Sequence, residues 1–147
     1  MRKRFALAAV AAVLGITAAT AQGDPIAARK ALMKGNNDNA KAVAKMMSGD
    51  EPFDAAKVDA AFAQWAETAQ KLPGLFPDNS KTGGQTRATA KIWERRSEFE
   101  AKDAAFAKAV ADNRDKSKTL DGLKASVPAV FKACDNCHEQ YRASSRR

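Results

Sequence analysis

The chain carries the run Cys134-Asp135-Asn136-Cys137-His138 close to its C-terminal end. Two cysteines at this spacing lie on one side of a helical turn, so each thiol can form a thioether bond with a vinyl group. The next residue, His138, can then turn its imidazole toward the iron. This C-x-x-C-H pattern is typical of a c-type haem attachment site, and an axial His leaves the other axial position to the rest of the chain. We therefore predict one covalently attached haem c at this run.

Three other interpretations of the run are weaker. A zinc site needs about four ligands, but the chain contains only these two cysteines and one histidine. A thioredoxin-like redox pair belongs near a βαβ pattern, and the sequence shows no strand-like alternation. A structural disulfide is the simplest alternative for two cysteines in an exported protein. Neither a disulfide nor a redox pair requires a His directly after the second Cys.

The N-terminal segment has the three parts of a secretory signal peptide. Residues 1–4 carry positive charge, an apolar stretch runs from Phe5 to about Thr17, and Ala19-Thr20-Ala21 is a small-x-small cleavage site. The apolar stretch is too short and too rich in alanine for a membrane span. We predict a cleaved signal peptide at 1–21, no stable membrane insertion afterwards, and one domain with a modest core at 22–147.

The formal net charge of +8 raises the question of an acidic partner. A basic surface can attract nucleic acid, but an exported protein rarely meets nucleic acid, and no basic stripe is interleaved with aromatic residues. We therefore expect no nucleic-acid partner. Solvated lysines on amphipathic helices account for most of the charge. A basic rim that steers an acidic redox protein is a second interpretation, because Arg142, Arg146 and Arg147 lie close to the haem motif.

Apolar residues recur at helical spacing through the mature chain, which is rich in Ala and Lys. One long loop, 73–90, contains most of the Pro and Gly turn signals and is expected to have a function. Four helices with two short connections predict an all-α, antiparallel up-down-up-down bundle. Pro128 lies inside the last helix and should kink it or remove one hydrogen bond. The expected helices run from Asp24-Pro25 to about Gly49, from Pro52 or Asp54 to before Pro73, from Ile92–Ser97 to Asn113–Lys118, and from about Thr119 through the haem motif.

The second axial ligand cannot be a histidine of this chain, because His138 is the only one. In an up-down-up-down bundle the start of the first helix lies beside the end of the last. Met33 and His138 would then both lie roughly 8–12 Å from the same end of the bundle, with Met46 and Met47 some 20 Å further along. We expect Met46 and Met47 to fill the core. Met33 is the candidate ligand, since a thioether suits haem iron. Alternatively, Met33 lines the distal pocket without bonding to the iron, or it is an unrelated core residue.

Arg29 precedes Met33 by one helical turn and lies on nearly the same face of the helix. A guanidinium there can pair with a haem propionate. The alternative is an ordinary exposed arginine.

Three motifs together resemble the class II c-type cytochromes, which comprise cytochrome c′ and its low-spin, methionine-ligated relatives. They are C-x-x-C-H in the last helix, Arg29-x-x-Leu32-Met33-Lys34 in the first, and Ile92-Trp93 after the long loop. The resemblance covers essentially the whole mature chain. It implies a periplasmic four-helix bundle with one haem c, thioether bonds from Cys134 and Cys137, and His138 as proximal ligand. It also implies that Arg29 contacts a propionate and that Arg142 lies near the ring of His138.

The residue at position 33 separates the two branches of this family. In cytochrome c′ it does not bond, and the five-coordinate iron stays open to nitric oxide or carbon monoxide. In the low-spin branch it is a bonded Met within Leu-Met-Lys-x-Asn, which Leu32-Met33-Lys34-Gly35-Asn36 matches. Lys30 departs from the Gln of many relatives, which puts a second propionate contact in doubt.

The function predicted from the resemblance is single-electron transfer in the periplasm without substrate turnover, so we expect no enzyme. Gas binding at an open distal face is the alternative, and a haem-free thiol oxidoreductase is a third. Redox proteins of the periplasm are the expected partners. A homodimer through exposed alanines and Phe53 is compatible with the sequence, but nothing in the sequence requires it.

Overall fold

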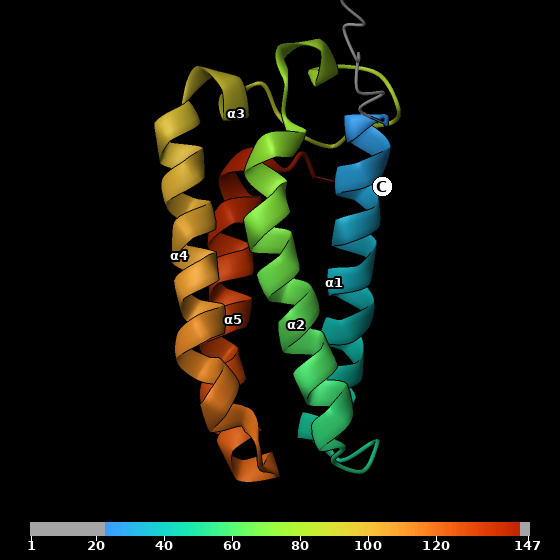
Figure 1. Cartoon of the computed structure of the whole chain (residues 1–147), viewed down its shortest axis with the longest axis vertical. Helices are drawn as coiled ribbons and strands as arrows, with labels where there is room; N and C mark the ends of the chain where they lie inside the picture. Colours follow the sequence, from blue (N-terminus) through green and yellow to red (C-terminus); the bar gives the residue numbers. More distant parts are fainter. Residues whose placement is uncertain (1–22, 145–147) are drawn as a thin grey trace, which may run out of the picture.

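The computed structural model describes residues 23–144. The predicted signal peptide at 1–21 lies outside the described residues, and so do Arg146 and Arg147. Four long helices pack side by side as an antiparallel bundle, which confirms the predicted all-α fold (Figure 1). They are α1 (Pro25–Ser48), α2 (Ala55–Lys71), α4 (Arg96–Arg114) and α5 (Leu120–Tyr141).

Local signals set the helix ends close to where the sequence predicts them. The side chain of Asp24 accepts a hydrogen bond from the first turn of α1, and Pro25 occupies its first position. Asp54 and Thr119 cap α2 and α5 in the same way. Helix α1 ends at Gly49, whose φ of 87° is the left-handed conformation that glycine adopts without strain.

The connection between α2 and α4 is more structured than the predicted loop. It contains the 3₁₀ turns η1 (Leu72–Leu75) and η2 (Asp78–Ser80) and the single helical turn α3 (Lys91–Glu94). Arg95, with φ −127° and ψ 51°, separates α3 from α4, so the predicted helix start at 92–97 spans a break in the backbone. A third 3₁₀ turn, η3 (Asp115–Ser117), precedes α5. Helix α5 itself continues through Pro128, which is exposed.

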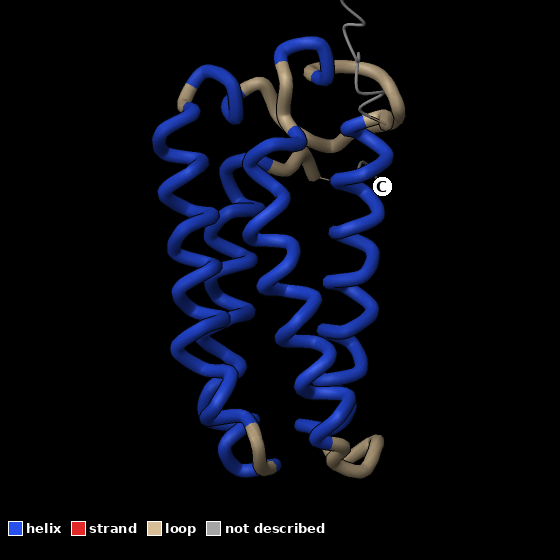
Figure 2. Tube along the Cα trace, viewed as in Figure 1, coloured by secondary structure: helices blue, strands red, loops and turns tan. Residues whose placement is uncertain are grey.

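This long connection covers one end of the bundle, where α1 begins and α5 ends (Figures 1 and 2). It lies tightly on α1: a Cβ added to Gly84 would lie 2.8 Å from Cγ2 of Ile26, and the φ of Gly84 is +53°. The tight turns between α1 and α2 and between α4 and α5 lie at the opposite end (Figure 2). We call the two ends the covered end and the turn end.

The core is divided along the bundle. A larger apolar cluster fills the middle and the turn end, and a smaller one lies beneath the connection at the covered end. Of the neighbouring helix pairs, α1 and α5 pack least closely. Of the helices within 23–144, none combines the length and the apolar character that crossing a bilayer demands. The larger cluster is Val43, Met46, Val58, Ala61, Phe62, Trp65, Ala69, Phe106, Val110, Leu123, Val127 and Val130; the smaller is Leu72, Phe76, Ile92, Phe99 and Tyr141.

Candidate functional site

Two adjoining cavities of about 500 and 420 Å³ lie toward the covered end, where α1 and α5 pack loosely. Because several residues line both cavities, the two lie side by side, and we refer to them together as the hollow. Its size suits a large cofactor, since ligand sites commonly enclose roughly 300–1,000 Å³. The residues that line both are Met33, Asn37, Leu72, Cys137, His138 and Arg142.

The two cysteines lie one helical turn apart on α5, and both are half-buried. Cys134 lines the larger cavity and Cys137 lines both. Burial raises the pKa of each thiol to about 11. A redox-active thiol needs a lowered pKa, so these thiols do not fit the thiol oxidoreductase interpretation. Their position at the wall of the hollow fits covalent attachment of a group inside it.

His138 follows Cys137 on the same helix and also lines both cavities. Burial lowers the pKa of its imidazole, and the positive charge of Arg142 lowers it further. The neutral imidazole is the form that binds a metal ion. His138 is therefore held in the protonation state that the prediction requires.

Met33 reaches the same hollow from the opposite side, on α1. It packs, half-buried, against the smaller apolar cluster, as Cys137 does. Met46 lies in the larger cluster with 1% of its surface exposed, and Met47 packs against that cluster, which confirms their predicted role as core residues. The structure thus brings Met33 together with His138; a bond from its sulfur to iron stays a prediction.

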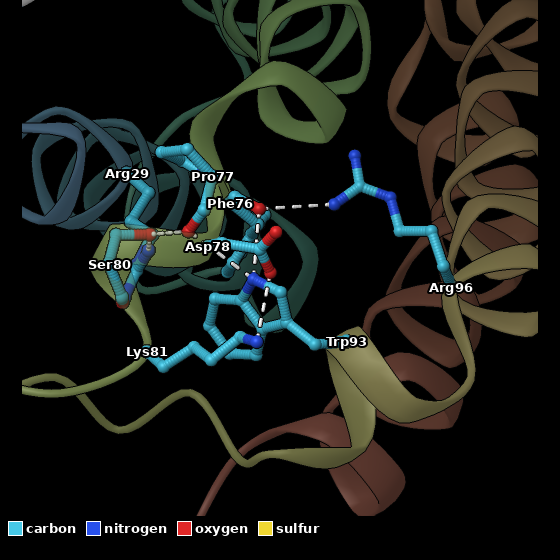
Figure 3. Close-up of polar contacts among 8 residues, drawn as sticks. All are labelled: Arg29, Phe76, Pro77, Asp78, Ser80, Lys81, Trp93 and Arg96. Atoms are coloured by element: carbon cyan, nitrogen blue, oxygen red, sulfur yellow. Dashed lines mark hydrogen bonds and ion pairs between the residues drawn. The ribbon is translucent and has the colours of Figure 1, made fainter.

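Arg29 is buried rather than exposed, so the alternative of an ordinary surface arginine is wrong. Its guanidinium donates to the carbonyl oxygen of Leu75 (3.0 Å), to Oγ and the carbonyl oxygen of Ser80 (both 2.9 Å), and to Oγ1 of Thr86 (2.8 Å). It also lies 4.6 Å from the ring centroid of Phe76 (Figure 3). Four of its five N–H donors therefore hold the connection. A propionate contact stays a prediction, and it would use Nε–H.

Trp93 and Arg96, at the covered end, make hydrogen bonds that the sequence did not predict. The indole N–H of Trp93 donates to the carbonyl oxygen of Phe76 (3.0 Å), and Arg96 donates to the same oxygen (3.2 Å) (Figure 3). Arg96 also donates to the carbonyl oxygen of Pro73 (2.6 Å). The bonds of Arg96 fix the connection to the start of α4, and the bond of Trp93 holds α3 against Phe76 within the connection. Trp93 stood out in the sequence only through its motif, and Arg96 carried no signal.

Arg142, directly after α5, lines both cavities while remaining exposed. An isolated β-bridge pairs it with Ala88, and Arg87 donates two hydrogen bonds to the carbonyl oxygen of Ala143. The connection therefore holds the end of α5 beside His138. The predicted place of Arg142 near that ring agrees with its effect on the imidazole pKa, while a functional role stays a prediction.

The charges around the smaller cavity are uniformly basic. No acidic residue lines it among residues 23–144, whereas five arginines and lysines do. Such a rim attracts anions, including carboxylates. These residues are Arg29, Lys30, Lys34, Arg87 and Arg142.

Two buried polar atoms in residues 23–144 have no hydrogen-bond partner: Oδ1 of Asp103 and the hydroxyl of Tyr141. Such atoms are rare in native proteins. Both side chains line the hollow, Asp103 in the larger cavity and Tyr141 in the smaller. The sequence offered a signal for Asp103 that went unused, because it interrupts the apolar stripe Phe99, Phe106, Val110 at helical spacing. Together with the thiols, the imidazole and the thioether, this hollow fits a haem.

Comparisons with known proteins agree with this fit. Residues 24–142 match the family model described as Cytochrome C′. Two proteins of Rhodopseudomonas palustris, called cytochrome c-556 and cytochrome c′, are each 41% identical over 143 residues. These alignments cover 95% and 97% of this chain, and 96% and 98% of the two relatives. The structure of cytochrome c′ from Rhodopseudomonas palustris superposes with a TM-score of 0.81 at 39% identity, covering 85% of this chain and all of that one. The structural model of oxidised cytochrome c556 from R. palustris gives 0.77 at 39% identity, covering 84% of this chain and 98% of that one.

Proposed function

This chain belongs to the cytochrome c′ family, and we propose that it carries single electrons with His138 and Met33 as the two axial ligands. As in that family, one haem c is attached covalently through Cys134 and Cys137. Proteins of the family are haem proteins and not enzymes. The two R. palustris relatives are equally identical to this chain, so the proposal has to come from its own residues.

One observation carries the proposal: Met33 and His138 line the same two cavities from two antiparallel helices. Bound haem c supplies an iron that alternates between the ferrous and ferric states. His138 offers a neutral nitrogen from α5, and Met33 offers a soft sulfur from α1. A thioether ligand favours the ferrous state and raises the reduction potential. The contacts of Arg29, Trp93 and Arg96 hold the connection over this end of the bundle.

The test is the visible spectrum of the haem-loaded ferric protein. Six-coordinate low-spin iron is expected, and the Met33→Ala variant should become high-spin and take up carbon monoxide when reduced. Met47→Ala is the matched control, because Met47 lies on the same helix and packs against the larger cluster; its spectrum should remain low-spin. An unchanged spectrum in Met33→Ala would remove Met33 as ligand.

A second candidate is a five-coordinate iron that binds nitric oxide or carbon monoxide. It is supported by the relative called cytochrome c′, which is as similar to this chain as the relative called cytochrome c-556. A high-spin spectrum of the unaltered ferric protein would favour this function over electron transfer.

We also propose the periplasm as the compartment and an acidic redox protein as the partner. The uniformly basic residues that line the smaller cavity support this choice, because opposite charges steer association. Electron exchange with such a partner should then slow as ionic strength rises, since salt screens exposed charges.

A further inference from the structure

Asp103 is a buried carboxylate that no contact explains. It lies on the core-facing stripe of α4 with 7% of its surface exposed, and its Oδ1 has no hydrogen-bond partner within the part of the chain that the structure describes. A buried charge without a partner destabilises a fold. Asp103 lines the larger cavity together with Cys134, Cys137 and His138. Its open oxygen therefore lies at the wall of the haem site.

The charges around this cavity come from three helices, and none of them forms an ion pair with Asp103 among residues 23–144. With no cation to hold the ionised form, burial raises the pKa of Asp103 to about 6. Protonated and ionised forms are then both accessible near neutral pH. The titratable and charged groups that face the cavity are Lys41 from α1, Lys102 from α4, and Cys134, Asp135, Cys137 and His138 from α5, with Arg142 just after it.

We propose that Asp103 couples the proposed electron transfer to protons, taking up a proton from solvent when the haem receives an electron and releasing it when the electron leaves. A bound haem c would accept one electron from a one-electron donor protein, and the protonated fraction of Asp103 would rise as its carboxylate takes up protons from solvent. For a tenfold difference in acid constant the site thereby gains one electron and, on average, up to about half a proton.

The physical reason is the charge of the iron. Ferric iron adds a positive charge that favours ionised Asp103, and reduction removes that charge. If a unit charge lies about 10 Å from a carboxyl group at an effective dielectric constant of about 20, it changes the acid constant of that group roughly tenfold. A tenfold difference between the oxidation states corresponds to a change of about 59 mV in a one-electron potential. The reduction potential should therefore fall as pH rises through the pKa of Asp103.

The test measures the midpoint potential of the haem-loaded protein across about pH 4.5–8, a range that spans the expected titration. In the unaltered protein a fall of about 59 mV is expected for a tenfold difference in acid constant. In Asp103→Asn this fall should be lost, because the amide does not titrate. Asp112→Asn is the control: Asp112 is an exposed carboxylate on the same helix, and its variant should keep the pH dependence of the unaltered protein.

A second measurement needs no variant. The infrared carboxyl band of Asp103, identified by isotope labelling, should titrate at a higher pH in the ferrous protein than in the ferric protein. An equal titration in both oxidation states would overturn the proposal, as would an Asp103→Asn variant that keeps the pH dependence. Both results are independent of Met33, whose bond to iron is judged by the spin state, so the two proposals can fail separately.

Discussion

The turn end and the covered end of the bundle are built from the same four helices but differ in how they are packed. Toward the turn end, Val43, Phe62, Leu123, Val127 and Val130 are fully buried in one apolar cluster. At the covered end the helices enclose a hollow with a basic rim and two unpartnered polar atoms. Apolar packing therefore stabilises one end, while the other gives up packing to hold a cofactor.

The covered end compensates with hydrogen bonds over long sequence distances. Arg29, Trp93 and Arg96 all donate to backbone oxygens of the connection (Figure 3). Substitutions at the turn end should therefore change stability alone, whereas substitutions at the covered end should change the haem environment as well.

The largest effect on stability is expected at the turn end. Phe62→Ala should lower the free energy of unfolding by about 3–5 kcal/mol, because Phe62 is fully buried. Denaturant titration of the haem-loaded protein measures this, and the visible spectrum should not change. Phe53→Ala, at a half-buried position packed against the same cluster, should cost less. A changed spectrum in Phe62→Ala would contradict the expectation that substitutions at the turn end change stability alone.

Arg29→Ala should lower the free energy of unfolding by about 2–4 kcal/mol, because it leaves buried oxygens without donors. Amide hydrogen exchange in the connection should accelerate at the same time. Arg29→Lys should restore little, since one ammonium cannot replace two forked pairs of donors. The neighbouring Lys30→Ala serves as control and should cost under about 0.5 kcal/mol, because Lys30 is exposed. Similar losses in Arg29→Ala and Lys30→Ala would contradict this role.

Asp103 should make stability depend on pH. Its pKa is raised from 3.8 to about 6. Its favourable contribution to the free energy of unfolding is therefore complete below pH 3.8 and is lost as pH rises through 6. In the ferrous protein, the free energy of unfolding of Asp103→Asn should rise relative to that of the unaltered chain as the pH goes from acid to alkaline. The expected rise is about 1–3 kcal/mol. Denaturant titrations at several pH values check this. A difference that does not vary with pH would show that Asp103 does not titrate in the folded protein.

The smallest effect concerns the helix caps. Asp54→Ala at the turn end and Asp24→Ala at the covered end should each cost about 1 kcal/mol, since each carboxylate accepts hydrogen bonds from the first turn of its helix. Thermal unfolding of the haem-loaded proteins measures both losses. We expect only Asp24→Ala to shift the spectrum, because α1 begins beside the hollow. Equal spectral shifts from both caps would weaken the comparison.

The sequence alone determined what depends on neighbouring residues. The spacing of Cys134, Cys137 and His138 defines haem attachment within one turn of helix, and Asp24 and Gly49 mark the ends of α1 by local hydrogen bonding and backbone freedom. The sequence also determined that Met33, and not Met46, lies at the same end of the bundle as His138, because helix length and antiparallel order fix which residues share an end.

Only the tertiary structure decided what depends on partners far along the chain. Arg29 finds its acceptors 46 to 57 residues away, and no local pattern predicts such a pairing. The break at Arg95 separates α3, which belongs to the connection, from α4. Helical spacing put Asp103 on the apolar stripe of α4, but only packing placed it at the wall of the hollow. Hydrogen bonds and burial of this kind arise between segments that are far apart in the sequence. The pattern of residues within one segment therefore does not predict which groups they join.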